Sequence, residues 1–236
     1  MADTGRPGRT GRHWRLAGWL ALATALAMGC NIPSLVYFLA PGDPREAPML
    51  MGLTPPEKGK AVRIAVMAYS GGETDTDLIT VERDLESQLS QQLFRDFKEN
   101  KQAVSIIPTG KVQEFKSNHP GWKKSMDLKE IAQYFKVDYL IYLEIDSISL
   151  YQNGSSRMLF QGRANITVSL LNARNPDESP NPKTFACMYP SASKAPIPND
   201  PSTSPRGFYM AFIEYMGKRL AWYFIPHEIN QDITCE

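Results

Sequence analysis

The chain has 236 residues, with 26 Lys and Arg against 25 Asp and Glu, so its formal net charge is +1. Four Arg and one Asp precede Cys30, and the rest of the chain holds 22 basic and 24 acidic residues, a formal charge of −2. Proteins that bind nucleic acids concentrate positive charge. A near-neutral chain therefore gives no reason to expect a nucleic-acid partner.

Residues 1–29 have the pattern of a secretory signal peptide. An uncharged apolar stretch runs from Leu16 to Met28 and ends in the small residue Gly29. The leader before it is basic and contains Arg6, Arg9, Arg12 and Arg15. Because a basic flank ahead of an apolar segment stays in the cytoplasm, the folded part is expected on the periplasmic side of the inner membrane.

The run Leu26-Ala27-Met28-Gly29-Cys30 resembles the lipobox of bacterial lipoproteins. In that motif a signal peptidase cuts before a cysteine that already carries diacylglycerol, so the resemblance implies a lipid on Cys30. Leu usually stands three residues before the cysteine, where this chain has Ala27. The resemblance also implies sorting to the outer membrane, because Asn31 and not Asp follows the cysteine.

An uncleaved membrane anchor is the alternative to lipidation. Residues 16–42 are uncharged and long enough to span a bilayer, although Pro33 interrupts them. Residues 30–60 are rich in Pro and Gly and predict a tether between the membrane and the domain. The apolar run at residues 35–39 suits either the bilayer interface or docking on the domain.

The folded domain is expected over residues 61–227. The sequence of its first half predicts a strand, a helix and a second strand. Val62 to Tyr69 is short, apolar and β-branched, as in a buried strand. Thr80 to Asn100 predicts an amphipathic helix. Its apolar stripe is Val81, Leu85, Leu89, Leu93 and Phe97, with Glu82, Arg83, Glu86 and Gln92 between them. Val104 to Ile107 predicts a second strand, which Pro108 stops.

A capping box predicts the next helix, because Asp127 and Glu130 have the spacing at which each side chain accepts a backbone N–H at a helix start. That helix is expected to run through Phe135. Residues 138–151 then alternate as in a long strand. Tyr139, Ile141, Leu143 and Ile145 share one face, and Leu140, Tyr142, Glu144 and Asp146 share the other.

The rest of the domain predicts a hairpin, a Pro-rich loop and a closing helix. Asn153-Gly154 marks the turn into a strand at residues 158–171. Residues 175–205 are crowded with Pro and leave room for a short strand at residues 184–188. Aromatic and aliphatic residues at helical spacing predict a helix over residues 208–224. The predicted fold is a single α/β domain, a mixed sheet packed with helices in the order β-α-β-α-β-β-β-α, followed by a tail at residues 228–236.

A family resemblance accompanies this order of elements. The strand Val62-Arg63-Ile64-Ala65-Val66 opens the domain, residues 135–145 (FKVDYLIYLEI) lead into the hairpin, and the hairpin contains Gly162. This pattern resembles a group that includes the curli secretion lipoprotein, lipoprotein activators of penicillin-binding proteins and the N-terminal domain of the Tol-Pal translocation protein. The resemblance covers about residues 61–224. It implies an accessory or assembly domain that acts by protein–protein contact or self-association.

Candidates for chemistry are few. The three histidines, His13, His119 and His227, are not spaced as metal ligands, so no metal or cofactor is expected. Ser70-Gly71-Gly72 predicts a turn, because acidic residues follow it where a phosphate site needs donors. Glu144 and Asp146 face one side of a strand, and with His119 they form the catalytic set of an alternative hydrolase hypothesis.

The leading hypothesis is a membrane-anchored, non-enzymatic envelope lipoprotein that binds another protein or itself. The hydrolase and a carrier of lipids or small ligands are the two alternatives. The carrier needs an apolar cavity. Cys187 and Cys235 remain a candidate disulfide, since an oxidising compartment permits the pair but the sequence does not fix the distance between them.

Overall fold

The computed structural model describes residues 45–57, 59–71 and 78–228, which belong to one compact unit that begins at Arg45. Its strands are β1 (Arg45–Glu46), β2 (Val62–Ser70), β3 (Val104–Ile106), β4 (Tyr139–Tyr151), β5 (Leu159–Asn172), β6 (Lys183–Tyr189), β7 (Ile197–Pro198) and β8 (His227–Glu228). Its helices are α3 (Val81–Glu99), α4 (Thr109–Asn118), α5 (Trp122–Ser125), α6 (Leu128–Phe135) and α7 (Pro205–Ala221), with a 3-10 turn at Pro176–Glu178. The predicted α/β fold class is confirmed.

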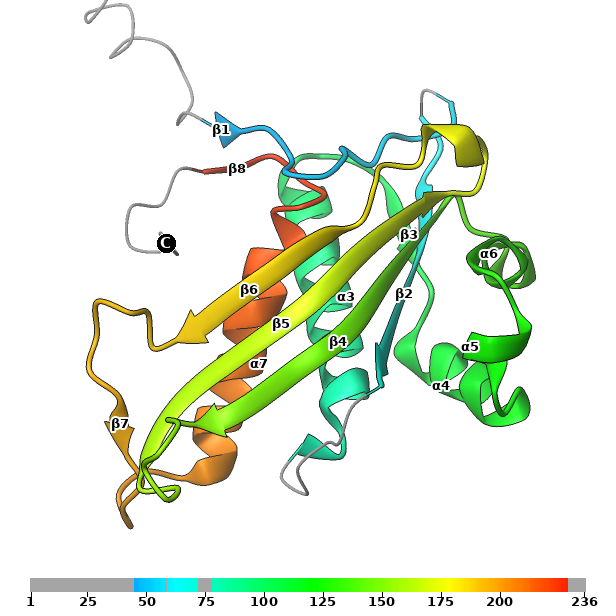
Figure 1. Cartoon of the computed structure of the whole chain (residues 1–236). Helices are drawn as coiled ribbons and strands as arrows, with labels where there is room; N and C mark the ends of the chain where they lie inside the picture. The colour runs from blue at the N-terminus through cyan, green and yellow to red at the C-terminus, as the bar shows by residue number, and fades with distance from the viewer. Residues whose placement is uncertain (1–44, 58, 72–77, 229–236) are drawn as a thin grey trace, which may run out of the picture. The chain divides into compact units, whose positions relative to one another are not determined.

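A mixed sheet forms the centre of the domain (Figure 1). Its strands lie in the order β3-β2-β4-β5-β6, and β7 pairs with the start of β5. β2 runs parallel to both β3 and β4, whereas β4, β5 and β6 are antiparallel to their neighbours. The parallel strands require helical crossovers, and the antiparallel ones need only turns.

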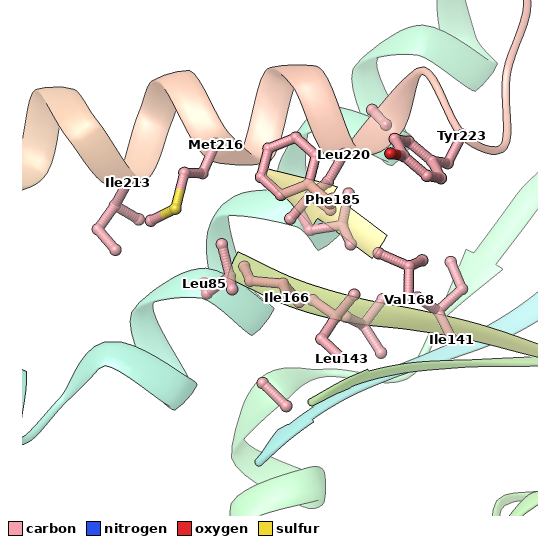
Figure 2. Packing of buried hydrophobic residues seen from close by; sticks show 14 of the residues in the cluster. Leu85, Ile141, Leu143, Ile166, Val168, Phe185, Ile213, Met216, Leu220 and Tyr223 are labelled. Atoms are coloured by element: carbon pink, nitrogen blue, oxygen red, sulfur yellow. The ribbon is translucent and has the colours of Figure 1, made fainter. Parts of the chain in front are cut away.

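The helices cover both faces of the sheet, so the domain has three layers. α3 and α7 pack together on one face, where the buried cluster includes Leu85, Met216 and Leu220 (Figure 2). α4, α5 and α6 cover the parallel part of the other face, with Phe115 and Ile131 at the centre of a second cluster. Residues along β2 alternate between the two clusters. A strand buried on both faces reads as a continuous apolar run, which explains its sequence.

The helix α3 confirms the stripe predicted from its spacing. All five apolar residues of that stripe are buried. One polar residue departs from the prediction, since Glu86 is fully buried although its position was assigned to the polar face. The cause is a neighbouring element, α4, which covers that side of the helix.

The capping box and the long hairpin are also confirmed. The Asp127 side chain accepts the Glu130 N–H at 2.8 Å, and the Glu130 side chain accepts the Asp127 N–H at 3.1 Å. β4 and β5 pair over most of their length, with an irregularity between Ile145 and Ser147. The two predicted faces of β4 hold in its first half, where the strand is buried on both sides.

Several elements were not predicted, and each depends on contacts distant in sequence. α4 and α5 fill the segment after Pro108, and α4 buries only Val112 and Phe115, too few for a periodic signal. β1 and β8 are two-residue strands that pair across the length of the chain. The last helix begins at Pro205, earlier than predicted, because Ser204 caps it through the Gly207 N–H at 3.2 Å.

The segment before β2 is attached to the domain. The N–H groups of Met49, Leu50 and Leu53 donate to backbone carbonyls of residues 222–224 at 2.9–3.3 Å. Leu53 is buried in the main cluster. The predicted signal peptide, the first part of the predicted tether and the apolar run at residues 35–39 lie outside the described residues.

Candidate functional site

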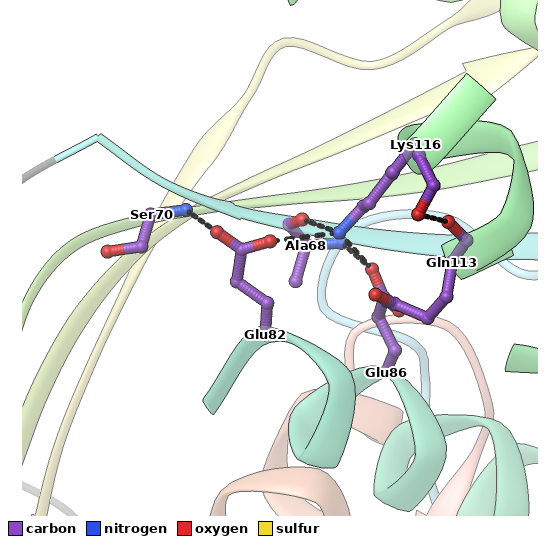
Figure 3. Close-up of polar contacts among 7 residues, drawn as sticks. Ala68, Ser70, Glu82, Glu86, Gln113 and Lys116 are labelled. Atoms are coloured by element: carbon purple, nitrogen blue, oxygen red, sulfur yellow. Dashed lines mark hydrogen bonds and ion pairs between the residues drawn. The ribbon is translucent and has the colours of Figure 1, made fainter. Parts of the chain in front are cut away.

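A buried charged cluster covers the edge of β2 (Figure 3). β3 pairs only with Val62–Ile64, so the second half of β2 has no strand on that side. Side chains bond to its backbone there instead. Glu86 Oε1 accepts the Ala68 N–H and Glu82 Oε1 accepts the Ser70 N–H, both at 2.8 Å. Lys116 Nζ donates to the Ala68 carbonyl at 2.5 Å.

The charges in this cluster are paired. Lys116 Nζ lies 2.7 Å from Glu86 Oε1 and 3.0 Å from Glu82 Oε2. Gln113 Nε2 donates to the other Glu86 oxygen at 2.6 Å. Burial raises the pKa of Glu86, against the opposing effect of the Lys116 ammonium. Since the polar atoms bond to one another and to the sheet, we interpret this cluster as a structural cap on an otherwise exposed strand edge.

A second polar cluster lies where β2 ends beside the middle of β4, and it contains one of the predicted acids. Glu144 pairs with Lys123, whose Nζ lies 3.8 Å above the centre of the Tyr69 ring. Trp122 packs edge-on against both Tyr69 and Tyr142, with ring centres 6.0 and 6.1 Å apart. Burial raises the pKa of Tyr142. Lys123 therefore covers the face of the Tyr69 ring and forms an ion pair with Glu144, the carboxylate that the hydrolase hypothesis assigns to catalysis.

The other residues of the hydrolase hypothesis lie in separate surroundings. Asp146 accepts a hydrogen bond from Thr167 at 2.9 Å. His119 ends α4, where its ring stacks on Phe115 and its Nδ1 lies 2.9 Å from the Phe115 carbonyl oxygen. No hydrogen bond or ion pair within the described ranges joins Glu144, Asp146 and His119. The hydrolase hypothesis required these groups to converge.

The carrier hypothesis required an apolar cavity. In the part of the domain that the structure describes, side chains such as Ile166, Met216 and Leu220 fill the space between the sheet and α7 (Figure 2). The described pockets, of about 320 to 390 Å³, are each bordered by polar or charged side chains. These pockets therefore give no specific support for a carrier of lipids or other apolar ligands.

The anchor and disulfide residues are only partly described. Cys187 is buried on β6, beneath the α7 side of the sheet. Cys30 and Cys235 lie outside the described residues, so lipidation and the Cys187–Cys235 pair stay predictions. Within the described segments, no helix is both long and apolar enough to cross a membrane, and no three His, Cys, Asp or Glu side chains are grouped as metal ligands.

A surface groove beside β3 is the feature best suited to contact another protein. It has a volume of about 390 Å³ and lies between α3 and the β3 end of the sheet. Phe94, Ile106 and Ile107 provide its apolar lining, and Ser87 and Gln91 provide polar groups. Phe94 is 53% exposed, unusual for so large an apolar side chain.

The backbone of β3 adds hydrogen-bonding groups to this groove. Ile107 N–H donates to β2 at 2.8 Å and the Ala103 carbonyl accepts from β2 at 3.0 Å. Because alternate residues of a strand direct their N–H and C=O groups to opposite sides, those of Val104 and Ile106 point away from β2. β3 is the terminal strand of the described sheet. An extended peptide could therefore pair with it.

Sequence reasoning did not find this groove. Phe94 follows Leu93 directly, so it falls beside the apolar stripe of α3 and not within it. A large aromatic residue on the polar side of an amphipathic helix was the available signal. Its neighbours in the groove come from a strand and loop that only the fold brings together.

Comparisons with known proteins give fold-level similarities. No model of a protein family and no curated protein matches the sequence. Among solved structures, a PelC dodecamer from Paraburkholderia phytofirmans is 11% identical, with a TM-score of 0.42 and coverage of 78% of this chain and 98% of that one. A lipoprotein from Neisseria meningitidis is 13% identical, with a TM-score of 0.37 and coverage of 69% and 97%. Rare lipoprotein B from Shewanella oneidensis is 13% identical, with a TM-score of 0.28 and coverage of 66% and 87%.

The chain is thus similar in structure, at low identity, to bacterial envelope lipoproteins. All three TM-scores are below 0.5, and we assign no family, residue role or oligomeric state on their basis. The finer resemblance to the curli and Tol-Pal group stays a prediction.

Proposed function

We propose that this protein is a non-enzymatic accessory domain of the bacterial cell envelope, anchored through lipid on Cys30, that binds an extended segment of another protein along β3. The observation that carries the proposal is the groove in which Phe94 lies exposed beside a strand with outward-facing backbone groups. A strand added at a sheet edge gains main-chain hydrogen bonds, and a neighbouring pocket selects its side chains.

The proposal assigns distinct roles to two parts of the groove. The outward N–H and C=O groups of Val104 and Ile106 would pair with a bound segment whatever its sequence. Phe94, Ile106 and Ile107 would accept one apolar side chain of that segment and set the preference for it. Buried aromatic anchors commonly supply much of the binding energy at interfaces, so Phe94 is the residue whose loss should matter most.

The binding site is tested by placing a photoreactive amino acid at position 94 of the full chain and irradiating cells that produce it. Position 134 provides the matched control, because Tyr134 is also a half-exposed aromatic residue, 54% exposed, on another helix. We expect a crosslink to a defined envelope protein from position 94 and none to the same protein from position 134. Equal crosslinking at both positions, or none at position 94, would refute the groove as the binding site.

The anchor is tested by the intact mass of the mature protein from the membrane fraction, compared with a Cys30→Ser variant. A mass that starts at Cys30 with added acyl chains, lost in the variant, supports lipidation. An unprocessed chain that stays in the membrane in both versions supports an uncleaved anchor instead. A soluble protein would contradict the proposed anchoring altogether.

A further inference from the structure

A second cavity, of about 350 Å³, lies between the C-terminal halves of α3 and α7, close to β1 and β8. Its volume falls in the lower part of the range for small-ligand sites, which is about 300–1,000 Å³. Unlike the Phe94 groove, it is lined largely by charged residues. Three are cationic, Arg45, Arg95 and Lys218, and three are acidic, Asp96, Glu99 and Glu214.

These six charges share one cavity without forming ion pairs among themselves. Glu214 and Lys218 are four residues apart on α7, with the acid first, the spacing that best favours a pair within a helix. Arg95 and Glu99 have the same separation on α3. Among the ion pairs of the described residues, none includes any of the six side chains. The cavity therefore presents both signs of charge to whatever enters it.

One buried polar group at this cavity also lacks a partner. His227 lines the cavity, and its side chain is only 9% exposed. Its ring stacks on Trp222 with 4.3 Å between ring centres and 4° between planes, which fixes its orientation. Nε2 lies 3.5 Å from a Glu46 oxygen, whereas Nδ1 is buried and has no hydrogen-bond partner in the described structure. A buried polar atom without a partner is costly unless a ligand or water satisfies it.

Hydrogen bonds to neighbouring amides hold three of the six charged side chains in place. Gln92 donates to Asp96 at 2.7 Å and accepts from Arg95 at 2.7 Å, so one amide orients an acid and a base. Arg45 donates to Asn100. Burial, together with the nearby charge of Glu99, raises the pKa of Asp96 to about 6. An added cation in the cavity would favour the ionised form of this carboxyl group.

From this arrangement we infer that the cavity binds a small amphoteric molecule, one that carries both a carboxylate and an ammonium group, such as an amino acid or a dipeptide with free ends. Lys218 on α7 is the partner that we assign to the carboxylate. Glu214, one helical turn earlier, is the partner that we assign to the ammonium group. The cavity and the groove beside Phe94 share one lining residue, Arg95, and the inference does not rest on the proposed function.

The test uses L-alanyl-L-alanine as the probe and saturation-transfer NMR on the full chain in detergent. We expect saturation transfer to the free dipeptide and none to its doubly capped form, N-acetyl-alanyl-alanine amide. Lys218→Met and Glu214→Gln should each weaken binding about tenfold, the effect of removing one charge-assisted hydrogen bond. Lys98→Met is the matched control, because Lys98 lies on α3 outside the cavity lining, and it should bind as the wild type does.

Four outcomes would overturn the inference. The first is the absence of saturation transfer to the free dipeptide, and the second is equal binding of the capped peptide. The third is displacement of the dipeptide by acetate alone at equal concentration, and the fourth is binding by both cavity variants as tight as that of the wild type. Circular dichroism of each variant shows whether a loss of binding comes from unfolding. The double variant Glu214→Lys with Lys218→Glu keeps both charges in exchanged positions and should bind the dipeptide better than either single variant does. A failed crosslink at position 94 would leave this result unchanged.

Discussion

The two halves of the β2 edge are covered in different ways. Along Val62–Ile64 a short strand, β3, pairs with the backbone. Along Ala68 and Ser70 two glutamates and a lysine bond to it instead. Along the first half, β3 becomes the edge strand of the sheet and lies beside Phe94. Along the second half, charged side chains occupy the backbone groups, so β2 is itself the last strand. Only the first arrangement leaves backbone groups for another chain to pair with.

This difference separates a structural cluster from the proposed binding surface. A buried glutamate, a partly exposed glutamate and a lysine in one place invite a catalytic interpretation, yet here each side chain bonds to the sheet backbone or to a neighbouring side chain. The groove holds no ion pair and no perturbed acid, but it exposes a large aromatic side chain. The paired polar side chains of the cluster contribute to stability, whereas the exposed Phe94 ring and the outward backbone groups of β3 suggest contact with another protein.

The largest expected effect is at the closed half of the edge. Glu86→Ala leaves the Ala68 N–H without its acceptor and removes the buried partner of Lys116, so we expect a loss of about 3–5 kcal/mol in the free energy of unfolding. Urea denaturation measures it. Glu86→Gln keeps an oxygen acceptor and should cost clearly less. Equal stability of Glu86→Ala and the wild type would show that the cluster does not support the strand edge.

The contact between Gly162 on β5 and Phe212 on α7, away from this edge, gives a second loss of stability for comparison with Glu86→Ala. A Cβ on Gly162 would lie 2.7 Å from the Phe212 ring, which is fully buried. Gly162→Ala should therefore destabilise the domain by about 1–3 kcal/mol, the usual range for overpacking. The melting temperature and the urea midpoint measure the loss. A neutral result would mean that α7 moves freely away from β5.

An exposed carboxylate with the same hydrogen-bonding role should matter less than Glu86. Asp127 accepts a backbone N–H, as Glu86 does, but at the surface start of α6. Asp127→Ala should cost about 1 kcal/mol, typical of a lost helix cap, whereas Asp127→Asn should cost little. A loss from Asp127→Ala as large as that from Glu86→Ala would refute the role assigned to burial.

The last expected effect is a change in pH dependence, which solvent screens in part because Asp96 is only partly buried. The pKa of Asp96 rises from 3.8 to about 6 on folding, so between these values the folded chain binds more protons than the unfolded chain. This residue's contribution therefore makes the domain less stable as pH rises from about 4 to 6. Asp96→Asn should remove that contribution, and unfolding at several pH values tests it. An unchanged slope in the variant would contradict the raised pKa.

The sequence predicted the elements whose signals are local. The stripe of α3 and the capping box of α6 depend on residues within a few positions, and both are present. Glu86 and Phe94 could not be assigned correctly, because each lies beside the apolar stripe of one helix. Whether such a residue is buried or exposed depends on where α4 and β3 lie, and those positions result from the fold of the whole chain.

Amide hydrogen exchange on the full chain tests the availability of the β3 edge most directly. We expect slow exchange at Ala68 and Ser70, whose N–H groups are bonded to glutamates, and fast exchange at Val104 and Ile106, whose N–H groups point outward. In Glu86→Ala the Ala68 amide should lose its protection while β3 is unchanged. Protection of Val104 and Ile106 as strong as that of Ala68 in the isolated protein would show that the β3 edge is already covered and would refute its proposed role in binding.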